Sequence, residues 1–139
     1  PDLLAAGADY VLVMGYDYQF DHGVGEPVAP LSWLQEVIAF TRTRITDPDR
    51  LIIGVPSYGY TGKFGGRAQI LTKAQALDLP GAQTATRDPG SAELQWSVGD
   101  QFTSYADTTT VSRKIDTVRA AGIRHISIWH LGGNDWFVQ

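Results

Sequence analysis

Three short apolar runs constrain this chain most, because two of them lead directly into aromatic and acidic side chains. The runs cover residues 10–14, 51–55 and 123–128. The first continues into Gly-Tyr-Asp-Tyr, and the third ends at Trp129 and His130. Runs this apolar predict strands buried on both faces, as in a parallel sheet, where ligand-binding groups follow the carboxyl ends of the strands. The sequence therefore predicts a binding site at the ends of the first and third runs.

Helical patterns lie between these strands. Pro30 can open a helix whose apolar side chains repeat every 3.6 residues at Leu34, Val37, Ile38, Thr41 and Ile45. Thr109 or Thr110 can cap a second helix that ends before Gly122. Alternating strands and helices predict a parallel sheet with right-handed crossovers, which is an α/β fold.

The amino-acid composition changes between residues 60 and 107, where Gly, Thr, Gln and Ala dominate and no long apolar run occurs. A short helix is expected at 72–77. Three antiparallel strands are expected at 84–87, 93–98 and 102–105, separated by Asp88-Pro-Gly and Gly-Asp turns. Residues 62–66 are expected to form a flexible loop. This part of the chain therefore predicts a separate small α+β unit.

Composition excludes several function classes. A net charge of −4 and eleven scattered Lys and Arg residues argue against a nucleic-acid partner. No apolar run reaches the roughly 20 residues that a membrane span needs. The chain has no Cys, and its three His do not have metal-ligand spacing, so we expect neither a metal nor a cofactor.

The chain begins at Pro1 without an initiator methionine or a signal sequence, so we interpret it as a piece of a longer protein whose localisation it does not reveal. Closing a β/α barrel takes eight strand-helix units and about 250 residues. The chain is therefore either part of a barrel or a smaller open sheet.

Four segments in order carry a family resemblance: YVLVMGYDYQF, GEPVAPLSWLQEVIAF, RLIIGVPSYGYTG and ISIWHLGGND. Together they resemble the second half of family 18 glycoside hydrolases, the chitinase-like enzymes, and most closely the bacterial spore-wall and cell-wall branch. The resemblance implies a partial (β/α)8 TIM barrel consisting of its last three strands, with a small α+β insertion domain. It implies barrel portions at 1–59 and 109–139 and an insertion at 60–108.

The resemblance also implies site residues. Met14, Tyr16 and Asp17 match the sixth-strand Met-x-Tyr-Asp motif, whose Tyr and Asp hold the N-acetyl group of the sugar and so support catalysis. Trp129 matches the eighth-strand tryptophan that forms the floor of this subsite. The chemistry agrees, because a hydroxyl and a carboxylate can hydrogen-bond an acetamido group and an indole can stack on a sugar. Tyr58 is a further substrate-binding candidate, and Tyr60 and Trp96 could form walls of the groove.

One family feature is missing from the chain. Family members carry a D-x-x-D-x-D-x-E signature on the fourth strand, whose Glu protonates the glycosidic oxygen. These 139 residues lack it, and Glu26, Glu36 and Glu93 do not end a buried strand. In this family the substrate's own acetamido oxygen acts as nucleophile, but an acid is still needed. We therefore expect the isolated chain to be inactive, with the acid located upstream or lost.

Two functions remain open: half of a retaining hydrolase, or a non-catalytic glycan-binding barrel. Either would bind polysaccharide containing N-acetylglucosamine, such as chitin or peptidoglycan, and the resemblance implies an extracellular or cell-wall location. Expected protein partners are the remainder of the barrel or, through exposed strand edges, a second copy. The alternative for Tyr16 and Asp17 is hydrogen bonding to neighbouring loops, and for Trp129 it is core packing. Tyr18, Trp33 and His130 are expected to be structural, and Asp135 could cap a final helix.

Overall fold

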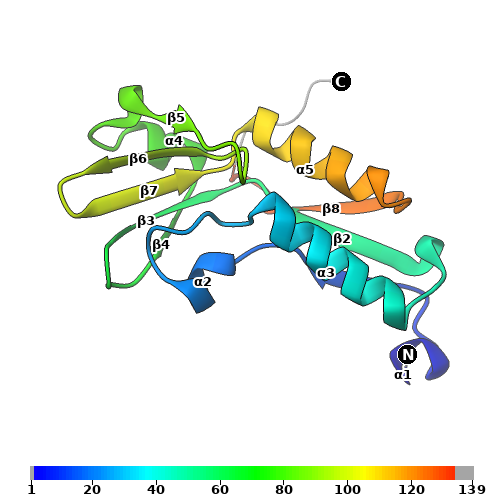
Figure 1. Ribbon diagram of the computed structural model, residues 1–139. Helices are drawn as coiled ribbons and strands as arrows, with labels where there is room; N and C mark the ends of the chain where they lie inside the picture. Colours follow the sequence, from blue (N-terminus) through cyan, green and yellow to red (C-terminus); the bar gives the residue numbers. More distant parts are fainter. Residues whose placement is uncertain (1, 134–139) are drawn as a thin grey trace.

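The computed structural model describes residues 2–133 and contains two β-sheets with helices packed against them (Figure 1). The first sheet has three parallel strands in the order β1-β2-β8, namely β1 (Val11–Met14), β2 (Leu51–Pro56) and β8 (His125–Trp129). Its helices are α1 (Asp2–Ala5), α3 (Leu31–Arg44) and α5 (Thr108–Ala120). The expected alternation of parallel strands and helices is confirmed. The sheet is open, and its place in a barrel stays a prediction.

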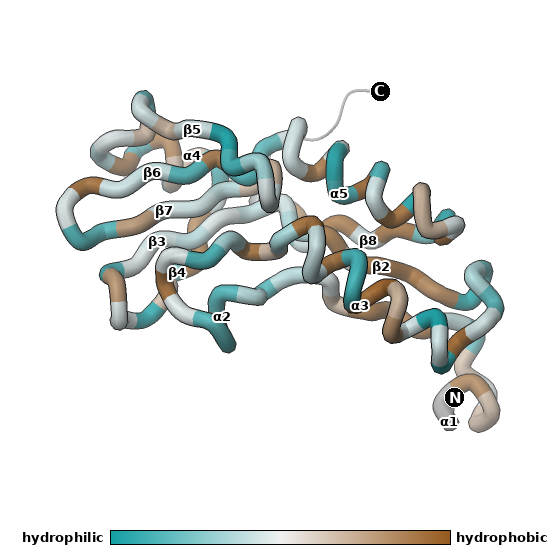
Figure 2. The backbone as a smooth tube through the Cα atoms, in the orientation of Figure 1, coloured by the Kyte–Doolittle hydropathy of each residue, from teal (hydrophilic) through white to brown (hydrophobic). Residues whose placement is uncertain are grey.

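One face of this sheet is covered by α3 and α5, which lie side by side (Figure 1). Hydrophobic segments gather where the two helices meet the strands (Figure 2). The core contains the expected helix positions together with alternate strand residues: Leu34, Ile38, Ile45, Leu51, Ile53, Val55, Val111, Val118 and Ile123. Burial of this shared apolar area is what holds both helices on the sheet.

The opposite face of the same sheet is exposed. Leu12 is 48% exposed, Met14 64% and Trp129 53%. The register pairs Met14 with Gly54, and Gly54 in turn with Ser127, so these three residues share the side of the sheet away from the helices. The expectation that the first strand has no exposed face is therefore wrong, because the described part of the chain leaves these side chains largely uncovered.

The second sheet has five antiparallel strands in the order β4-β3-β7-β6-β5. Its elements are β3 (Gly59–Lys63), β4 (Gln69–Leu71), α4 (Lys73–Leu77), β5 (Thr86–Arg87), β6 (Leu94–Val98) and β7 (Gln101–Tyr105). Residues 62–63 were expected in a loop but belong to the inner strand β3. A Cβ at Gly62 would lie 2.8 Å from Val24 Cγ2, so this glycine permits close packing rather than flexibility.

Both faces of the five-stranded sheet are covered near its centre. Helix α4 packs on one face with a cluster of Leu71, Ala76, Trp96 and Tyr105. On the other face, Tyr60 and Phe102 pack against Val28 from the segment before α3. The domain boundaries expected from the sequence stay a prediction.

The cap of α5 differs from the expected Thr109 or Thr110. Asp107 is the cap, and its carboxylate accepts the N–H of Thr110 at 2.8 Å. Arg87 of β5 donates two hydrogen bonds to the same carboxylate, at 2.9 and 2.7 Å. The start of α5 is thus tied to the five-stranded sheet, an interaction between distant residues that local sequence does not reveal.

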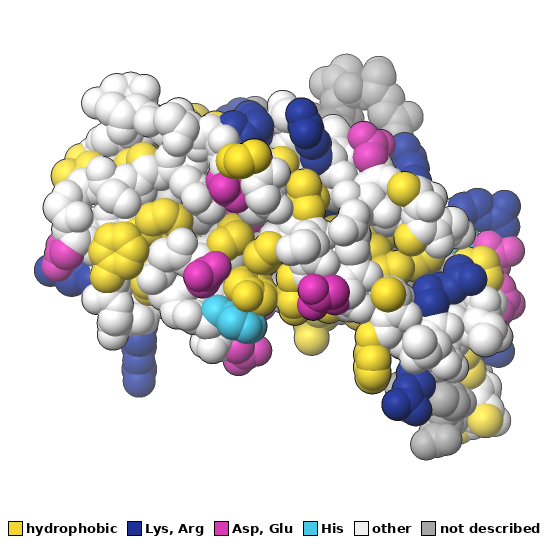
Figure 3. Space-filling view, in the orientation of Figure 1, with side chains coloured by type: hydrophobic (Ala, Val, Ile, Leu, Met, Phe, Trp, Pro, Cys, Tyr) yellow, Lys and Arg dark blue, Asp and Glu magenta, His cyan; other side chains and the backbone are white. Residues whose placement is uncertain are grey.

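The remaining short elements are α2 (Tyr18–His22) and 3₁₀ turns at Pro48–Arg50 and Ala82–Thr84. No helix within residues 2–133 is long and apolar enough to cross a membrane. On the face shown in Figure 3, Lys and Arg side chains are spread out rather than gathered into a patch. Asp135, expected to cap a final helix, lies outside the described residues.

Candidate functional site

Tyr16 and Trp129 meet at the carboxyl end of the parallel sheet. Their rings stack with centroids 6.3 Å apart and planes 13° from parallel. Tyr16 follows β1 and lies over β2, where a Cβ at Gly54 would come within 2.8 Å of its ring. Gly54 therefore makes room for Tyr16, and the two strands bring together an aromatic pair that the sequence separates by 113 positions. Met14 lies on the same exposed face of the sheet.

Asp17 is held in place from two directions. Its backbone has φ 74°, in the left-handed region directly before α2, and its carbonyl accepts the N–H of Phe20 at 3.0 Å. The hydroxyl of Tyr58 donates a hydrogen bond to Asp17 Oδ1. The other carboxylate oxygen, Oδ2, has no hydrogen-bond partner within residues 2–133. The carboxylate is thus oriented by the protein through one of its two oxygens.

Both tyrosines beside Asp17 hold their protons firmly. Burial raises the pKa of Tyr58 far above its ordinary value, and the hydrogen bond to Asp17 raises it further. Burial also raises the pKa of Tyr16, with the charge of Asp17 as the second cause. Both phenols therefore stay protonated and able to donate at neutral pH.

The structure corrects the expected walls of the groove. Tyr58 and Tyr60 are buried, so neither ring can stack on a sugar. Tyr60 instead joins β3 to the segment between α2 and α3: its hydroxyl donates to the Glu26 carbonyl at 2.6 Å and accepts the Gly25 N–H at 3.0 Å. Burial is the main cause that raises the pKa of Tyr60 to about 12. Direct contact of Tyr58 with substrate stays a prediction, and its hydroxyl positions Asp17.

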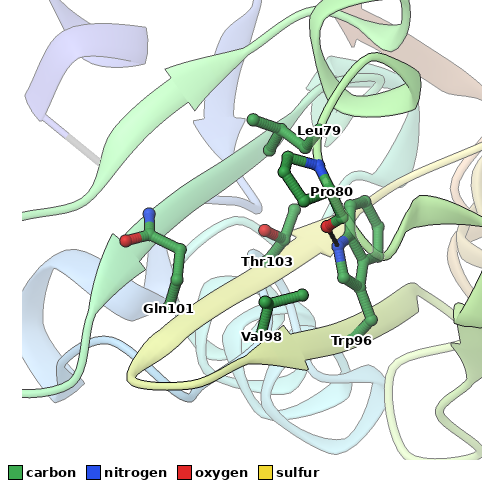
Figure 4. Close-up of a pocket in the computed structure, with 6 residues that line it drawn as sticks. All are labelled: Leu79, Pro80, Trp96, Val98, Gln101 and Thr103. Carbon is green, nitrogen blue, oxygen red and sulfur yellow. Dashed lines mark hydrogen bonds between the residues drawn. The ribbon is translucent and has the colours of Figure 1, made fainter.

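Trp96 is also buried, within the five-stranded sheet. Its indole N–H donates to the Pro80 carbonyl at 3.1 Å, and it lines a small cavity of about 130 Å³ with Val98 and Thr103 (Figure 4). This ring lies on the α4 face of the sheet, opposite the face that carries Tyr60. The expectation that Trp96 forms an exposed wall of the groove is therefore wrong.

Ser57 and His130 both support the end of β8. The Ser57 N–H donates to the Trp129 carbonyl at 2.7 Å, and its hydroxyl lies 3.2 and 3.3 Å from the Trp129 and His130 carbonyls. The Trp129–His130 peptide bond is cis. His130 Nδ1 lies 2.8 Å from the Leu131 carbonyl. The Ser57 contacts hold the segment that carries Trp129, and the structural role expected for His130 stays a prediction.

Sequence reasoning missed a buried ion pair between Glu93 and Lys114. Both side chains are fully buried, and Lys114 Nζ lies 2.9 Å from Glu93 Oε1. The carboxylate also accepts the N–H groups of Val28 and Ala29 at 2.8 and 2.9 Å and the Ser104 hydroxyl at 2.6 Å. One sequence signal was present, because Lys114 lies on the apolar stripe of its helix, three residues after Val111 and four before Val118.

This ion pair supports the site indirectly. It fixes Val28, whose carbonyl accepts the N–H of Tyr18 at 3.0 Å, next to Asp17. The Lys114 ammonium donates to the Ala29 carbonyl as well. The pair therefore joins the five-stranded sheet, α5 and the segment before α3. Within residues 2–133, no group of three or more His, Asp and Glu side chains is arranged to hold a metal ion.

The chain is similar in sequence to known proteins. The chain is 29% identical over 141 residues to the putative sporulation-specific glycosylase YdhD of Bacillus subtilis, across 92% of this chain and 33% of that protein. It spans about a third of the length of the curated relatives it matches, since the cortical fragment-lytic enzyme of B. subtilis is covered over 31%.

Solved structures share the fold. A chitinase from Chromobacterium violaceum matches with a TM-score of 0.76 and 27% identity, over 95% of this chain and 44% of that one. The spore cortex-lytic enzyme SleL of Bacillus cereus matches with a TM-score of 0.77 and 20% identity, over 90% and 32%. The model of the family described as glycosyl hydrolases family 18 matches residues 1–135. This chain, with its mixed α/β fold, therefore belongs to glycosyl hydrolase family 18.

Proposed function

We propose that this chain forms the sugar-binding half of a family 18 glycosidase that acts on polysaccharide containing N-acetylglucosamine, either chitin or a peptidoglycan-like glycan. The observation that carries the proposal is the stacked pair of Tyr16 and Trp129 beside an Asp17 that Tyr58 orients. An exposed indole can stack on the apolar face of a pyranose ring. The free oxygen of Asp17 and the Tyr16 hydroxyl can hold its acetamido group.

Each residue has a separate part in the reaction. Trp129 forms the floor under the sugar, and Tyr16 donates a hydrogen bond to the acetamido group. Asp17 orients that group so that its oxygen can attack the anomeric carbon, which is the substrate-assisted route of this family. Because an orienting charge acts mainly in the transition state, Asp17 contributes more to turnover than to binding.

The general acid comes from outside these 139 residues. In this proposal β1, β2 and β8 are the sixth to eighth strands of a barrel, and the exposed face with Leu12 and Met14 is part of its interior. The five-stranded sheet is the insertion domain. The rest of the barrel supplies the fourth-strand Glu and covers the exposed strands.

A non-catalytic glycan-binding protein is the second candidate, because the stacked Tyr16–Trp129 pair would serve binding alone as well as it would serve catalysis. The sequence of the full-length protein separates the two. A buried strand that ends in D-x-D-x-E favours the enzyme, whereas a substituted Glu favours the binding protein. Both candidates use the same aromatic site.

The test compares two variants of the full-length protein. Trp129→Ala should weaken binding of N-acetylglucosamine oligomers by about 1–3 kcal/mol, because the stacking surface is lost. Asp17→Asn should lower kcat more than it raises KM. Titration calorimetry and steady-state kinetics measure these effects.

Phe40→Ala is the matched control for Trp129, because Phe40 is an exposed aromatic side chain on α3. It should leave binding unchanged. Equal titration curves for wild type and Trp129→Ala would reduce Trp129 to a structural residue and refute the proposed site.

A further inference from the structure

Four aromatic side chains at the candidate site contact one another in a closed cycle. Tyr16 contacts both Trp129 and Tyr58, with ring centroids 6.3 Å apart in each pair. His130 contacts the same two rings, with centroids 5.9 Å apart in each pair. Aromatic rings attract one another at centroid separations of about 4.5–7 Å. His130 therefore connects Trp129 to Tyr58, as Tyr16 does, although the family resemblance indicated only Tyr16.

The two rings that His130 connects belong to different parts of the proposed site. Trp129 is 53% exposed, and within residues 2–133 its aromatic contacts are those with Tyr16 and His130. Tyr58 is buried, and its hydroxyl donates to the carboxylate of Asp17. A ring packed against both residues restrains the exposed indole relative to the buried phenol and, through that phenol, relative to the carboxylate.

The imidazole of His130 is itself held in place. Its Nδ1 lies 2.8 Å from the Leu131 carbonyl, and because a carbonyl oxygen only accepts, Nδ1 carries a hydrogen and donates it. The segment that follows is packed at Gly133, whose carbonyl accepts the Lys73 N–H at 2.7 Å and where a Cβ would lie 2.8 Å from the Ser57 carbonyl oxygen. A ring anchored in this way can restrain its neighbours.

We propose that His130 is a positioning residue, whose ring fixes the orientation of Trp129 relative to Tyr58 and Asp17. The inference rests on the proposed function and adds to it a residue that acts through other side chains. Without the ring, the indole is free to tilt, which weakens stacking on a sugar. Tyr58 also loses a packing neighbour, so Asp17 is oriented less well, and small misplacements of an orienting group lower the rate.

The experiment replaces His130 in three ways in the full-length protein. His130→Phe keeps an aromatic ring, His130→Asn keeps a hydrogen-bond donor without a ring, and His130→Ala keeps neither. His130→Phe should retain affinity and kcat to within about twofold. The other two should each lower affinity for chitotetraose and kcat by about fivefold, as expected for the loss of one aromatic pair. Titration calorimetry measures the affinity, and steady-state kinetics measures kcat.

A matched control is available on the same strand. His125 lies at the opposite end of β8, with its ring 5.6 Å from that of Tyr10. His125→Ala should leave affinity and kcat unchanged, and urea unfolding shows whether each variant is folded under assay conditions. Equal losses in His130→Phe and His130→Ala would overturn the inference, because the ring would then not be the group that acts.

Double variants separate positioning from a general structural role. If His130 acts on binding through Trp129, adding His130→Ala to Trp129→Ala should cause no further loss of affinity. If it acts on turnover through Tyr58, adding His130→Ala to Tyr58→Phe should lower kcat less than it does in wild type. Full additivity in both backgrounds would overturn the inference, since His130 would then act independently of these two residues.

The same measurements distinguish failure of this inference from failure of the proposed function. If wild type does not bind chitotetraose, or if Trp129→Ala binds as well as wild type, the proposed function fails and the role of His130 fails with it. If Trp129→Ala loses affinity while His130→Ala does not, only the role of His130 is refuted. In a protein that binds without hydrolysis, the affinities alone decide.

Discussion

The two sheets of this protein differ in how completely they are covered. The five-stranded sheet has α4 and its apolar cluster on one face and Val28 with its neighbours on the other. The three-stranded sheet has α3 and α5 on one face, while Leu12, Met14 and Trp129 stay exposed on the other. A parallel sheet is ordinarily buried on both faces.

The two sheets therefore differ in role: the three-stranded sheet carries the candidate site, and the five-stranded sheet holds the segments around it in place. The candidate sugar-binding residues lie at the end of the sheet with an exposed face, where a ligand can reach them. The five-stranded sheet contributes buried polar contacts that hold the segments around Asp17, through Glu93 and Tyr60. Three predictions test this division, from the largest expected effect to the smallest.

The largest effect is expected from breaking the buried ion pair that joins the sheets. Glu93→Leu would leave the fully buried Lys114 ammonium without its charge partner and Val28 and Ala29 without their acceptor. Removing one member of such a pair costs about 3–5 kcal/mol of unfolding free energy. Urea denaturation of the full-length protein measures the loss.

Two controls accompany this variant. Lys63→Met removes an exposed pair with Asp100 in the same sheet and should have little effect. Adding Lys114→Met to Glu93→Leu should recover part of the loss, because no unpaired charge remains buried. A loss no larger than that of Lys63→Met would show that the ion pair does not hold the two sheets together.

The exposed face of the three-stranded sheet predicts self-association of the 139-residue chain, because uncovered apolar strands and free edges tend to pair. Leu12→Lys should weaken this association by about tenfold, since it places a charge on the exposed face. Sedimentation across a concentration series measures the change. Val98→Lys is the matched control, because Val98 in the covered sheet is 48% exposed, as is Leu12. A wild-type chain that stays monomeric at high concentration would contradict the prediction.

The smallest effect concerns Tyr60, whose hydroxyl connects the five-stranded sheet to residues 25 and 26 between α2 and α3. An unfolded tyrosine loses its proton near pH 10, whereas burial raises the pKa of Tyr60 to about 12. The folded state binds the extra proton in this interval, so its stabilising contribution falls as pH rises from 10 to 12. The stability difference between wild type and Tyr60→Phe should therefore shrink over that range in urea titrations. A constant difference would contradict the pKa shift.

Much of the fold was predictable because its signals are local. The 3.6-residue apolar spacing located α3 and its buried face at Leu34 and Ile38, and the apolar runs located the three parallel strands to within two residues. Gly62 misled the prediction, because a strand glycine that permits close packing looks like a loop glycine in sequence. The cap at Asp107 was missed because nearby threonines compete for the same position and Arg87 makes its contact from 20 residues away.

The candidate site was predictable in part. The family resemblance indicated Tyr16, Asp17 and Trp129, and the structure brings Tyr16 and Trp129 into contact. Their action on a sugar stays a prediction. Nothing in the sequence showed that Tyr58 is buried with its hydroxyl on Asp17, because that depends on how the segment after β2 packs against the start of α2.

The sequence by itself determined the order of strands and helices and the apolar face of each helix, since these follow from side chains a few positions apart. Only the tertiary structure decided which polar groups are paired. Glu93 accepts a hydrogen bond from the Val28 N–H, which is 65 positions away in the sequence, and pairs with Lys114, which is 21 positions away. The Gln19 amide, in contrast, is buried with no described hydrogen-bond partner. The physical reason is that a buried polar group is satisfied only by whatever the packing of distant segments places beside it.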